Sequence, residues 1–307
     1  MRRNAYFEYI SPWGKLLLIL GLVLLFSILT SFGGLLIGKY WLGTDLAALA
    51  DLLSHPVTVQ AIQFTKFFQF LNQLGVFIIP VFMYAVFVSN SSSEYLGLRR
   101  KPMFTSLIIS VAIVFTILPF LNYISDLNAN MKFPEGWSVV EQWMAEKEAQ
   151  AKMLTEAFLK TTTIPGLAVN LVIVALIPAL GEEMLFRGVL LRLFNEAFKN
   201  VHVAVFVSAF VFSLIHLQFF GFLPRLIMGL ILGYLFVSTK NLWYPIAFHF
   251  VNNAASVIIF FLYNKNGVGS GAEGFGASNS IIIIVGSLLV SVLLLLVVKK
   301  RYDVRVL

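Results

Sequence analysis

The sequence predicts an all-α protein, a polytopic transmembrane helical bundle of about eight spans with both termini in the cytoplasm. Of its 307 residues, 59% are hydrophobic and 12% are charged, whereas soluble domains are about 25% charged. The apolar residues gather in runs near the length of about 20 residues that crosses a bilayer. Basic residues lie beside these runs, as they do in the cytoplasmic loops of membrane proteins.

Eight apolar runs are the candidate spans. They cover residues 16–37, 67–88, 104–124, 164–191, 201–220, 223–237, 244–263 and 280–298. The first run is too long for a signal-peptide core, so we interpret it as a retained helix.

Basic clusters fall on one side of the bundle if all eight runs cross the membrane. These clusters are Arg2, Arg3 and Lys15; Arg99, Arg100 and Lys101; Arg192 and Lys199; Lys240; and Lys299, Lys300 and Arg301. The opposite loops are acidic or mixed, so the positive-inside rule predicts cytoplasmic termini. The same rule accounts for the net charge of +7, and we do not predict nucleic-acid binding.

Three regions are expected. Residues 1–159 hold the N-terminal transmembrane helices and an outer polar loop, residues 160–263 a catalytic core, and residues 264–307 a Gly-rich loop and the last span. The polar stretch 125–162 is either a helix on the outer surface or a solvated connector. The chain has no cysteine, which excludes disulfides, thiolate metal sites and cysteine nucleophiles.

Run 164–191 carries three charges that an apolar helix does not tolerate against lipid, Glu182, Glu183 and Arg187. Each would cost about 2.5–3.5 kcal/mol at the bilayer centre, so we expect all of them to face the bundle interior. Glu183 and Arg187 are four residues apart and can pair on one helix face. Glu182 lacks such a partner and is a candidate general base. A purely structural ion-pair network is the alternative.

Two of the four histidines lie well inside apolar runs, whereas His202 is at the start of run 201–220 and His55 is near a loop. His216 ends the segment FSLIH, and His249 is followed four residues later by Asn253 in the segment HFVNN. Taken singly, each could be a packing residue or a hydrogen-bonding contact between helices. A carboxylate, two imidazoles and a carboxamide on three different apolar helices together predict a buried reactive site.

These residue types suit hydrolysis. Glu182 and a histidine can polarise a water molecule, while His249 and Asn253 can donate hydrogen bonds to a developing oxyanion. Alternatively, Glu182, His216 and His249 could hold a divalent metal such as zinc and leave a position for water. The residues alone leave both mechanisms open.

The segments EEMLFR, FSLIH and HFVNN match, in order, the EExxxR, FxxxH and HxxxN motifs. The chain therefore resembles the CPBP family of intramembrane proteases, also called the Abi or type II CAAX prenyl endopeptidase family, over residues 160–260. The resemblance implies that Glu182 activates water with help from His216. It also implies that His249 and Asn253 stabilise the oxyanion or that the histidines hold a metal, with Glu183 and Arg187 in support.

The resemblance implies an intramembrane endopeptidase of the metallo or glutamate type, acting on a membrane-associated or lipidated peptide. We expect a multi-pass protein of a bacterial cell membrane whose partners are membrane lipid and such a substrate. There are two alternative hypotheses. One is a catalytically silent immunity or scaffold protein, and the other is a proton-coupled transporter built on the same Glu and His residues.

Overall fold

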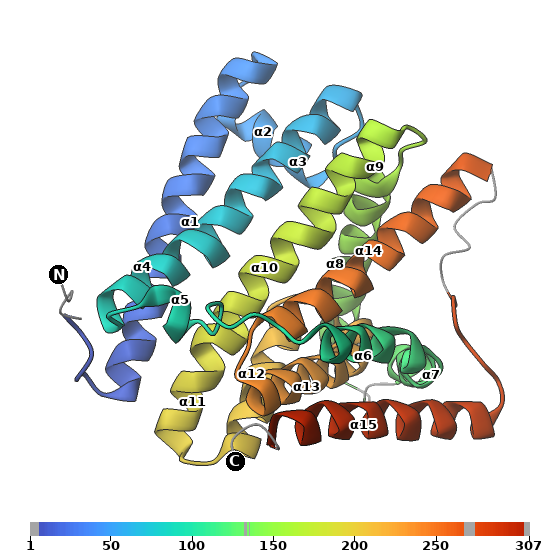
Figure 1. Cartoon of the computed structure of the whole chain (residues 1–307). Helices are drawn as coiled ribbons and strands as arrows, with labels where there is room; N and C mark the ends of the chain where they lie inside the picture. The colour runs from blue at the N-terminus through green and yellow to red at the C-terminus, as the bar shows by residue number, and fades with distance from the viewer. Residues whose placement is uncertain (1–5, 132–133, 135, 267–273, 304–307) are drawn as a thin grey trace.

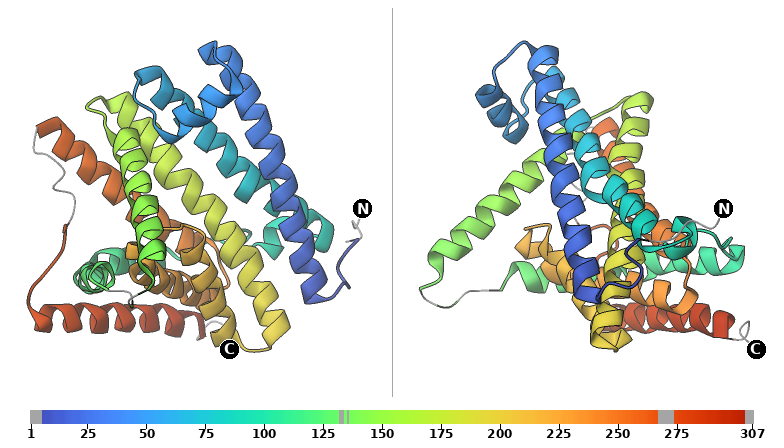
Figure 2. Two further views of the ribbon diagram at one scale, coloured as in Figure 1. Left: turned by 180° about the vertical axis from the view of Figure 1, so that it is seen from behind. Right: turned by 90° about the vertical axis from the view of Figure 1, so that its left-hand side faces the viewer.

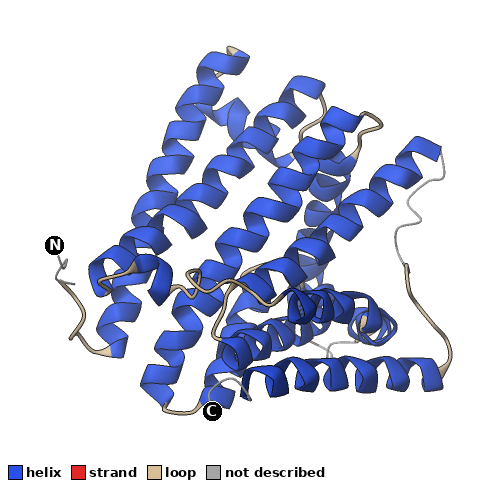
Figure 3. Ribbon diagram, viewed as in Figure 1, coloured by secondary structure: helices blue, strands red, loops and turns tan. Residues whose placement is uncertain are grey.

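All the apolar runs form helices in the computed structural model, which describes residues 6–131, 134, 136–266 and 274–303. No strand occurs within these ranges, and Figure 3 shows helices joined by loops and turns. The predicted all-α class is therefore confirmed for the described chain. Arg2, Arg3 and residues 267–273 of the predicted Gly-rich loop lie outside the described residues.

The N-terminal part of the chain is dominated by three long helical stretches. Its elements are α1 (Pro12–Leu42), α2 (Leu46–Ser54), α3 (Val59–Gln73), the π-helix η1 (Leu74–Ile78), α4 (Ile79–Val88), α5 (Ser92–Tyr95), α6 (Phe104–Thr116), α7 (Leu118–Ala129) and α8 (Ser138–Leu159). α3, η1 and α4 form one continuous helix of 30 residues. α6 and α7 meet at a 42° bend, where Pro119 lacks the N–H that would continue the helix.

The C-terminal part holds the motif-bearing runs. Its elements are α9 (Ile164–Asn170), the π-helix η2 (Leu171–Leu176), α10 (Ile177–Glu183), the π-helix η3 (Met184–Leu190), α11 (Leu191–Phe198), α12 (Val201–Leu214), the 3₁₀-helix η4 (Phe219–Gly221), α13 (Phe222–Thr239), α14 (Trp243–Asn266) and α15 (Ile281–Asp303). The elements from α9 to α11 form one helix of 35 residues.

Six helices in the described chain are long and apolar enough to cross a membrane, or seven if the bent pair α6 and α7 counts as one span. The prediction of about eight spans differs because run 201–220 forms only the 14-residue helix α12. That helix is about 21 Å long at 1.5 Å per residue, against a hydrocarbon core of about 30 Å. The chain is a multi-pass integral membrane protein.

The long helices form two groups. α1, the α3–α4 helix, the α9–α11 helix and α14 lie side by side in that order (Figure 1), and neighbours in this row are in contact. The second group contains α6, α12, α13 and α15, with α13 in contact with α12, α14 and α15. Figure 2 shows that α15 lies at the edge of the bundle in both views. Few side chains in the apolar windows of α1 and α15 are buried, as expected for lipid-facing helices.

The polar stretch before α9 is largely helical. α8 covers 22 residues, of which only Met144 and Leu159 are buried. The stretch is thus helical, and its place on the outer surface of the membrane stays a prediction. Figure 2 shows α8 inclined across one side of the bundle.

Two glycines let the helices around the charges of Glu182, Glu183 and Arg187 approach closely. A Cβ at Gly181 in α10 would lie 2.7 Å from the Cβ of Phe77 in η1. A Cβ at Gly229 in α13 would lie 2.9 Å from that of Ala209 in α12. Both distances are below van der Waals contact, so glycine is what allows the backbones to pack at these crossings.

The basic loop residues come together at one end of the bundle. Lys15 pairs with Glu196 at 3.1 Å, which joins the start of α1 to α11. The Asn241 side chain donates to the carbonyl of Arg100 at 2.9 Å, and Arg301 donates to Thr105 at 2.7 Å. The basic clusters predicted to share one side of the membrane are therefore neighbours in space.

Candidate active site

Glu182 and Glu183 are the last two residues of α10, and a π-helix lies on each side of this short α-helix. A π-helix widens the turn by one residue and changes the direction in which later side chains point, and such segments are frequent at functional sites. Both carboxyl groups are buried: Glu182 is 7% exposed and Glu183 is 0% exposed. The prediction that these charges face the bundle interior is confirmed.

Glu183 pairs with Arg187, as the spacing of the two residues predicts. Arg187 Nη1 donates to Glu183 Oε1 at 2.7 Å, and Nη2 donates to the carbonyl oxygen of Gly229 at 3.1 Å. Both side chains are inaccessible to solvent, at 1% and 0% exposure. Each buried charge compensates the other, and removal of either partner would leave an uncompensated ion.

His249 on α14 bridges the two carboxylates. Its Nδ1 lies 2.8 Å from Glu183 Oε1, and its Nε2 lies 3.9 Å from Glu182 Oε2. Sequence spacing allowed Glu182 to point into a separate cavity, but in the structure both glutamates face opposite edges of the same imidazole. The contact between Glu183 and His249 was not predicted, because it depends on how α10 and α14 are rotated against each other.

This geometry assigns roles to the two ring nitrogens. An ionised carboxylate can only accept hydrogen bonds, so His249 Nδ1 donates to Glu183. In the neutral ring, Nε2 then carries the lone pair and faces Glu182. The 3.9 Å separation of Nε2 and Oε2 is too long for a direct hydrogen bond, and it suits a water oxygen about 2.8 Å from each atom.

Phe212 on α12 connects the three motifs through its ring. The ring centroid lies 5.1 Å from that of His216 and 6.0 Å from that of His249, and the Arg187 guanidinium carbon lies 4.7 Å from it. Phe212 is 1% exposed. The phenylalanine of the FxxxH motif therefore separates the two imidazoles and covers the buried ion pair, a role that sequence spacing did not reveal.

His216 follows the end of α12 and makes no hydrogen bond to either glutamate. Its Nδ1 lies 2.7 Å from the carbonyl oxygen of Phe212, so this nitrogen donates and Nε2 is left to accept in the neutral ring. Asn253 lies one helical turn from His249 on α14, but its Nδ2 donates to the carbonyl of Val174 at 3.3 Å. Direct contacts thus join Glu182, Glu183, Arg187 and His249, while His216 joins through Phe212 and Asn253 lies further along α14.

The predicted metal set is not assembled as a ligand cluster. Among the described residues, no three His, Asp or Glu side chains form a group that could hold a metal ion. Nδ1 of His249 faces Glu183 and Nδ1 of His216 faces a backbone carbonyl, so Nε2 is the one nitrogen on each ring that could bind a metal. Because Glu182, His216 and His249 form no such group, no chemical step is assigned to a metal.

Arg225 on α13 is a charged neighbour that the sequence interpretation passed over. Its guanidinium donates to Gln218 Oε1 at 2.8 Å and to the carbonyl oxygen of the same residue at 3.3 Å. The signal was present, because Arg225 lies in apolar run 223–237, where a charge marks a functional position as strongly as Glu182 does.

A cavity of about 470 Å³ lies between α8, α14 and the bent pair α6 and α7. Asn252, next to Asn253, and Gln218, the partner of Arg225, form part of its wall. α8 contributes polar side chains including Glu148, and α6 and α14 contribute apolar ones such as Phe115 and Ile259. A mixed wall of this kind can accept a peptide with one apolar face.

Comparison with known proteins identifies one part of the chain. Residues 164–255 match the family model for type II CAAX prenyl endopeptidase, Rce1-like. This segment is similar to an Rce1-like domain. The match runs from the first residue of α9 into α14 and includes every residue of the cluster around His249. The resemblance to the CPBP family is thereby confirmed for residues 164–255. No curated protein and no solved structure matches the chain.

Proposed function

We propose that the chain is an intramembrane endopeptidase of the CPBP type that hydrolyses a peptide bond of a membrane-associated or lipidated substrate. The observation that carries this proposal is the pair Glu182 Oε2 and His249 Nε2, buried and 3.9 Å apart, with the imidazole oriented by Glu183. The Rce1-like match over residues 164–255 supports the same activity.

In the proposed reaction, a water molecule is held between Glu182 and His249. Its oxygen attacks the scissile carbonyl carbon while its proton passes to Glu182 Oε2. That proton then moves to the amide nitrogen as the C–N bond breaks, leaving a carboxylic acid and an amine. Glu183 keeps the His249 ring in one tautomer, as the carboxylate does in other histidine-containing catalytic sites.

The developing oxyanion needs a hydrogen-bond donor. Asn253 Nδ2 is the neutral donor on the same helix as His249, and rotation of its side chain away from Val174 would free it for this role. Because its Nδ1 donates to Phe212, the neutral His216 ring offers Nε2 as an acceptor, and it is not assigned as a donor to the oxyanion. In this proposal Arg187 positions Glu183 through the ion pair between them, and Glu183 in turn orients His249.

The cavity beside Asn252 is the proposed substrate channel. Its walls come from α8, α14 and the bent pair α6 and α7, and in this proposal a peptide enters it from the side of α8. We further propose that both termini are cytoplasmic, that α12 is a short eighth crossing, and that the protein resides in a bacterial cell membrane. The gathering of the basic loops at one end supports this orientation.

The decisive experiment compares membrane-protein fragments in cells that express the wild type, Glu182→Gln or Glu141→Gln. Glu141 is an exposed carboxylate on α8 and serves as the matched control. We expect fragments that depend on the wild type to vanish with Glu182→Gln and to persist with Glu141→Gln. Equal cleavage by a folded Glu182→Gln protein would rule out Glu182 as the base. If the same fragments appear in the wild type, in both variants and in cells that lack the protein, the proposed protease activity is ruled out.

A further inference from the structure

A second cavity, of about 740 Å³, lies at the basic end of the bundle, away from the residues of the candidate active site. It is enclosed by the loop that follows α4, the side of α11 and the C-terminal end of α13. Its charged and polar lining is Glu94, Arg99, Arg100, Arg192, Asn195, Glu196 and Lys240. None of its lining residues belongs to the three motifs. One of its walls, α11, is the continuation of the helix that carries the EExxxR segment.

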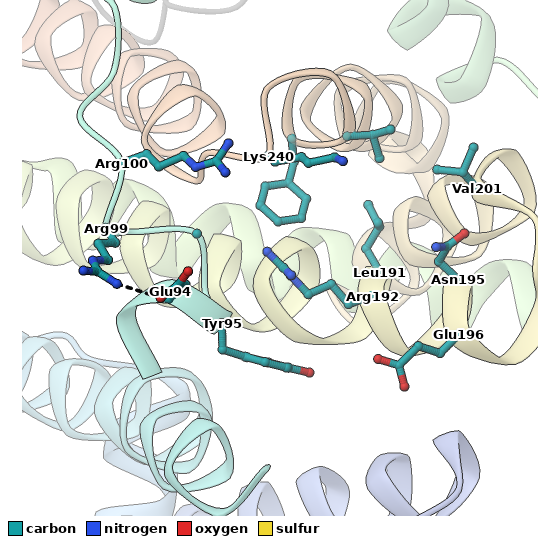
Figure 4. A pocket seen from close by; sticks show the side chains of 13 residues that line it. Glu94, Tyr95, Arg99, Arg100, Leu191, Arg192, Asn195, Glu196, Val201 and Lys240 are labelled. Atoms are coloured by element: carbon teal, nitrogen blue, oxygen red, sulfur yellow. Dashed lines mark hydrogen bonds and ion pairs between the residues drawn. The ribbon is translucent and has the colours of Figure 1, made fainter. Parts of the chain in front are cut away.

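The lining carries an excess of positive charge that the protein does not neutralise. Glu94 pairs with Arg99 at 2.8 Å, and Glu196 pairs with Lys15 of α1 at 3.1 Å. Both carboxylates are thus occupied. Arg100, Arg192 and Lys240 form no ion pair within the described part of the chain. Figure 4 shows Arg100 and Lys240 on one side of the cavity and Arg192 on the other, with its guanidinium end turned towards them.

Arg192 is held in a fixed orientation. Its guanidinium carbon lies 5.5 Å from the ring centroid of Tyr95 and 5.1 Å from that of Phe236. Its Nε is buried and has no hydrogen-bond partner. Aromatic faces can stabilise an arginine and restrict its rotation, but they leave the in-plane N–H groups unpaired. A planar, unpaired set of donors matches the oxygens of a phosphate.

The loop that carries Arg99 and Arg100 is fixed to the turn between α13 and α14. Leu242 N donates to Gly97 O at 3.0 Å, and the Trp243 indole donates to Leu98 O at 3.0 Å. The Asn241 side chain donates to Arg100 O at 2.9 Å. These bonds fix the backbone of the loop, so binding need not order it.

One wall of the cavity is apolar. Leu191, Val201 and Val237 line it from α11, α12 and α13. A site for a free ion alone needs no such wall, whereas a phosphodiester attached to glycerol and acyl chains would place its apolar part there. The volume is also within the range of about 300–1,000 Å³ that is typical of small-molecule pockets.

We propose that this cavity binds the phosphoryl group of an anionic phospholipid headgroup, with Arg100, Arg192 and Lys240 as its ligands. The site lies at the end of the bundle where the basic loops gather, so the headgroup would come from the membrane leaflet on that side. Inorganic phosphate offers the same phosphoryl oxygens from solution. Only the lipid would also place an apolar part against the apolar wall. The proposal is independent of proteolysis.

The test uses the purified full-length protein in an uncharged detergent. It is titrated with dihexanoyl phosphatidylglycerol, with dihexanoyl phosphatidylcholine and with inorganic phosphate. Thermal unfolding, followed by tryptophan fluorescence, reports binding because a ligand of the folded state raises the unfolding temperature. Native mass spectrometry reports the number of lipids bound.

The variants are Arg192→Gln and the double change Arg100→Gln with Lys240→Gln; Lys300→Gln is the control. Arg100 and Lys240 are exposed, so the double variant should fold even if Arg192→Gln does not. Lys300 is an exposed cation at the end of α15 that does not line the cavity. At about 1 kcal/mol for each basic residue, we expect about fivefold weaker phosphatidylglycerol binding per charge removed, and about 25-fold for the double variant.

The expected result is saturable stabilisation of the wild type and Lys300→Gln by phosphatidylglycerol, with one tightly bound lipid and no effect of phosphatidylcholine. Stabilisation by inorganic phosphate that is lost in the same variants would support the site with a soluble phosphate as its source. Equal phosphatidylglycerol affinity in the wild type and the double variant would overturn the proposal. So would the absence of saturable binding by both phosphatidylglycerol and phosphate.

Discussion

The buried pair of Glu183 and Arg187 gives the sharpest stability prediction. In Arg187→Met the guanidinium is replaced by an apolar chain, and the protein loses the bonds to Glu183 Oε1 at 2.7 Å and to Gly229 O at 3.1 Å. Glu183 would remain at 0% exposure with only His249 beside it. Removing one partner of a buried ion pair costs about 3–5 kcal/mol, so we expect the free energy of unfolding to fall by that amount.

The assay is unfolding of the detergent-solubilised protein by increasing mole fractions of sodium dodecyl sulfate. The double variant Glu183→Gln with Arg187→Met should recover part of the loss, because it leaves no unpaired buried charge. The matched control is Arg99→Met, which breaks an ion pair of 2.8 Å whose side chains are 69% and 65% exposed. Exposed pairs contribute about 0–1 kcal/mol, so this variant should change little.

Two results would refute this reasoning. One is a loss of less than about 1 kcal/mol in Arg187→Met, which would mean that Glu183 is neutral or solvated in the folded protein. The other concerns the double variant. If its fall in the free energy of unfolding equals the sum of the falls in Glu183→Gln and Arg187→Met, the two side chains do not interact.

Further predictions concern the active site, packing, metal dependence and topology. Phe212→Leu should leave the protein folded but lower the cleavage rate by about 100-fold, because misplacing the histidines by about 1 Å has that effect; steady-state cleavage measures this. Gly181→Ala should lower the free energy of unfolding by about 1–3 kcal/mol, since its Cβ would come within 2.7 Å of a neighbouring side chain. Gly21→Ala, which would meet nothing within 4 Å, is the control in the same unfolding assay. Cleavage should be unchanged after dialysis against a metal chelator, and inactivation that zinc reverses would contradict the geometry of the site. Because the chain has no cysteine, Asp51→Cys should be labelled by an impermeant maleimide in intact cells, whereas Lys300→Cys should be labelled only after permeabilisation; the reverse pattern would invert the proposed topology.

The sequence predicts the helices well, because a run of apolar residues in lipid must satisfy its own backbone hydrogen bonds and so becomes helical. It predicts the lengths less well. The run 201–220 looks like a full span, but α12 stops at Leu214 and the chain turns through the 3₁₀-helix η4 before α13 begins. The π-helices on either side of α10 are also invisible in the residue pattern, since the same residue types occur in ordinary α-helices.

The candidate active site is likewise only partly predictable from the sequence. The sequence by itself determined that Glu182, Glu183 and Arg187 must turn inwards, because charges against lipid are too costly, and the spacing of four residues determined that Glu183 and Arg187 pair. Only the tertiary structure decided that His249 lies between both glutamates, that Phe212 separates it from His216, and that Asn253 bonds to Val174. Those contacts depend on the rotation and tilt of packed helices, which are set by close approaches such as the one at Gly181 and leave no mark on the spacing along a single helix.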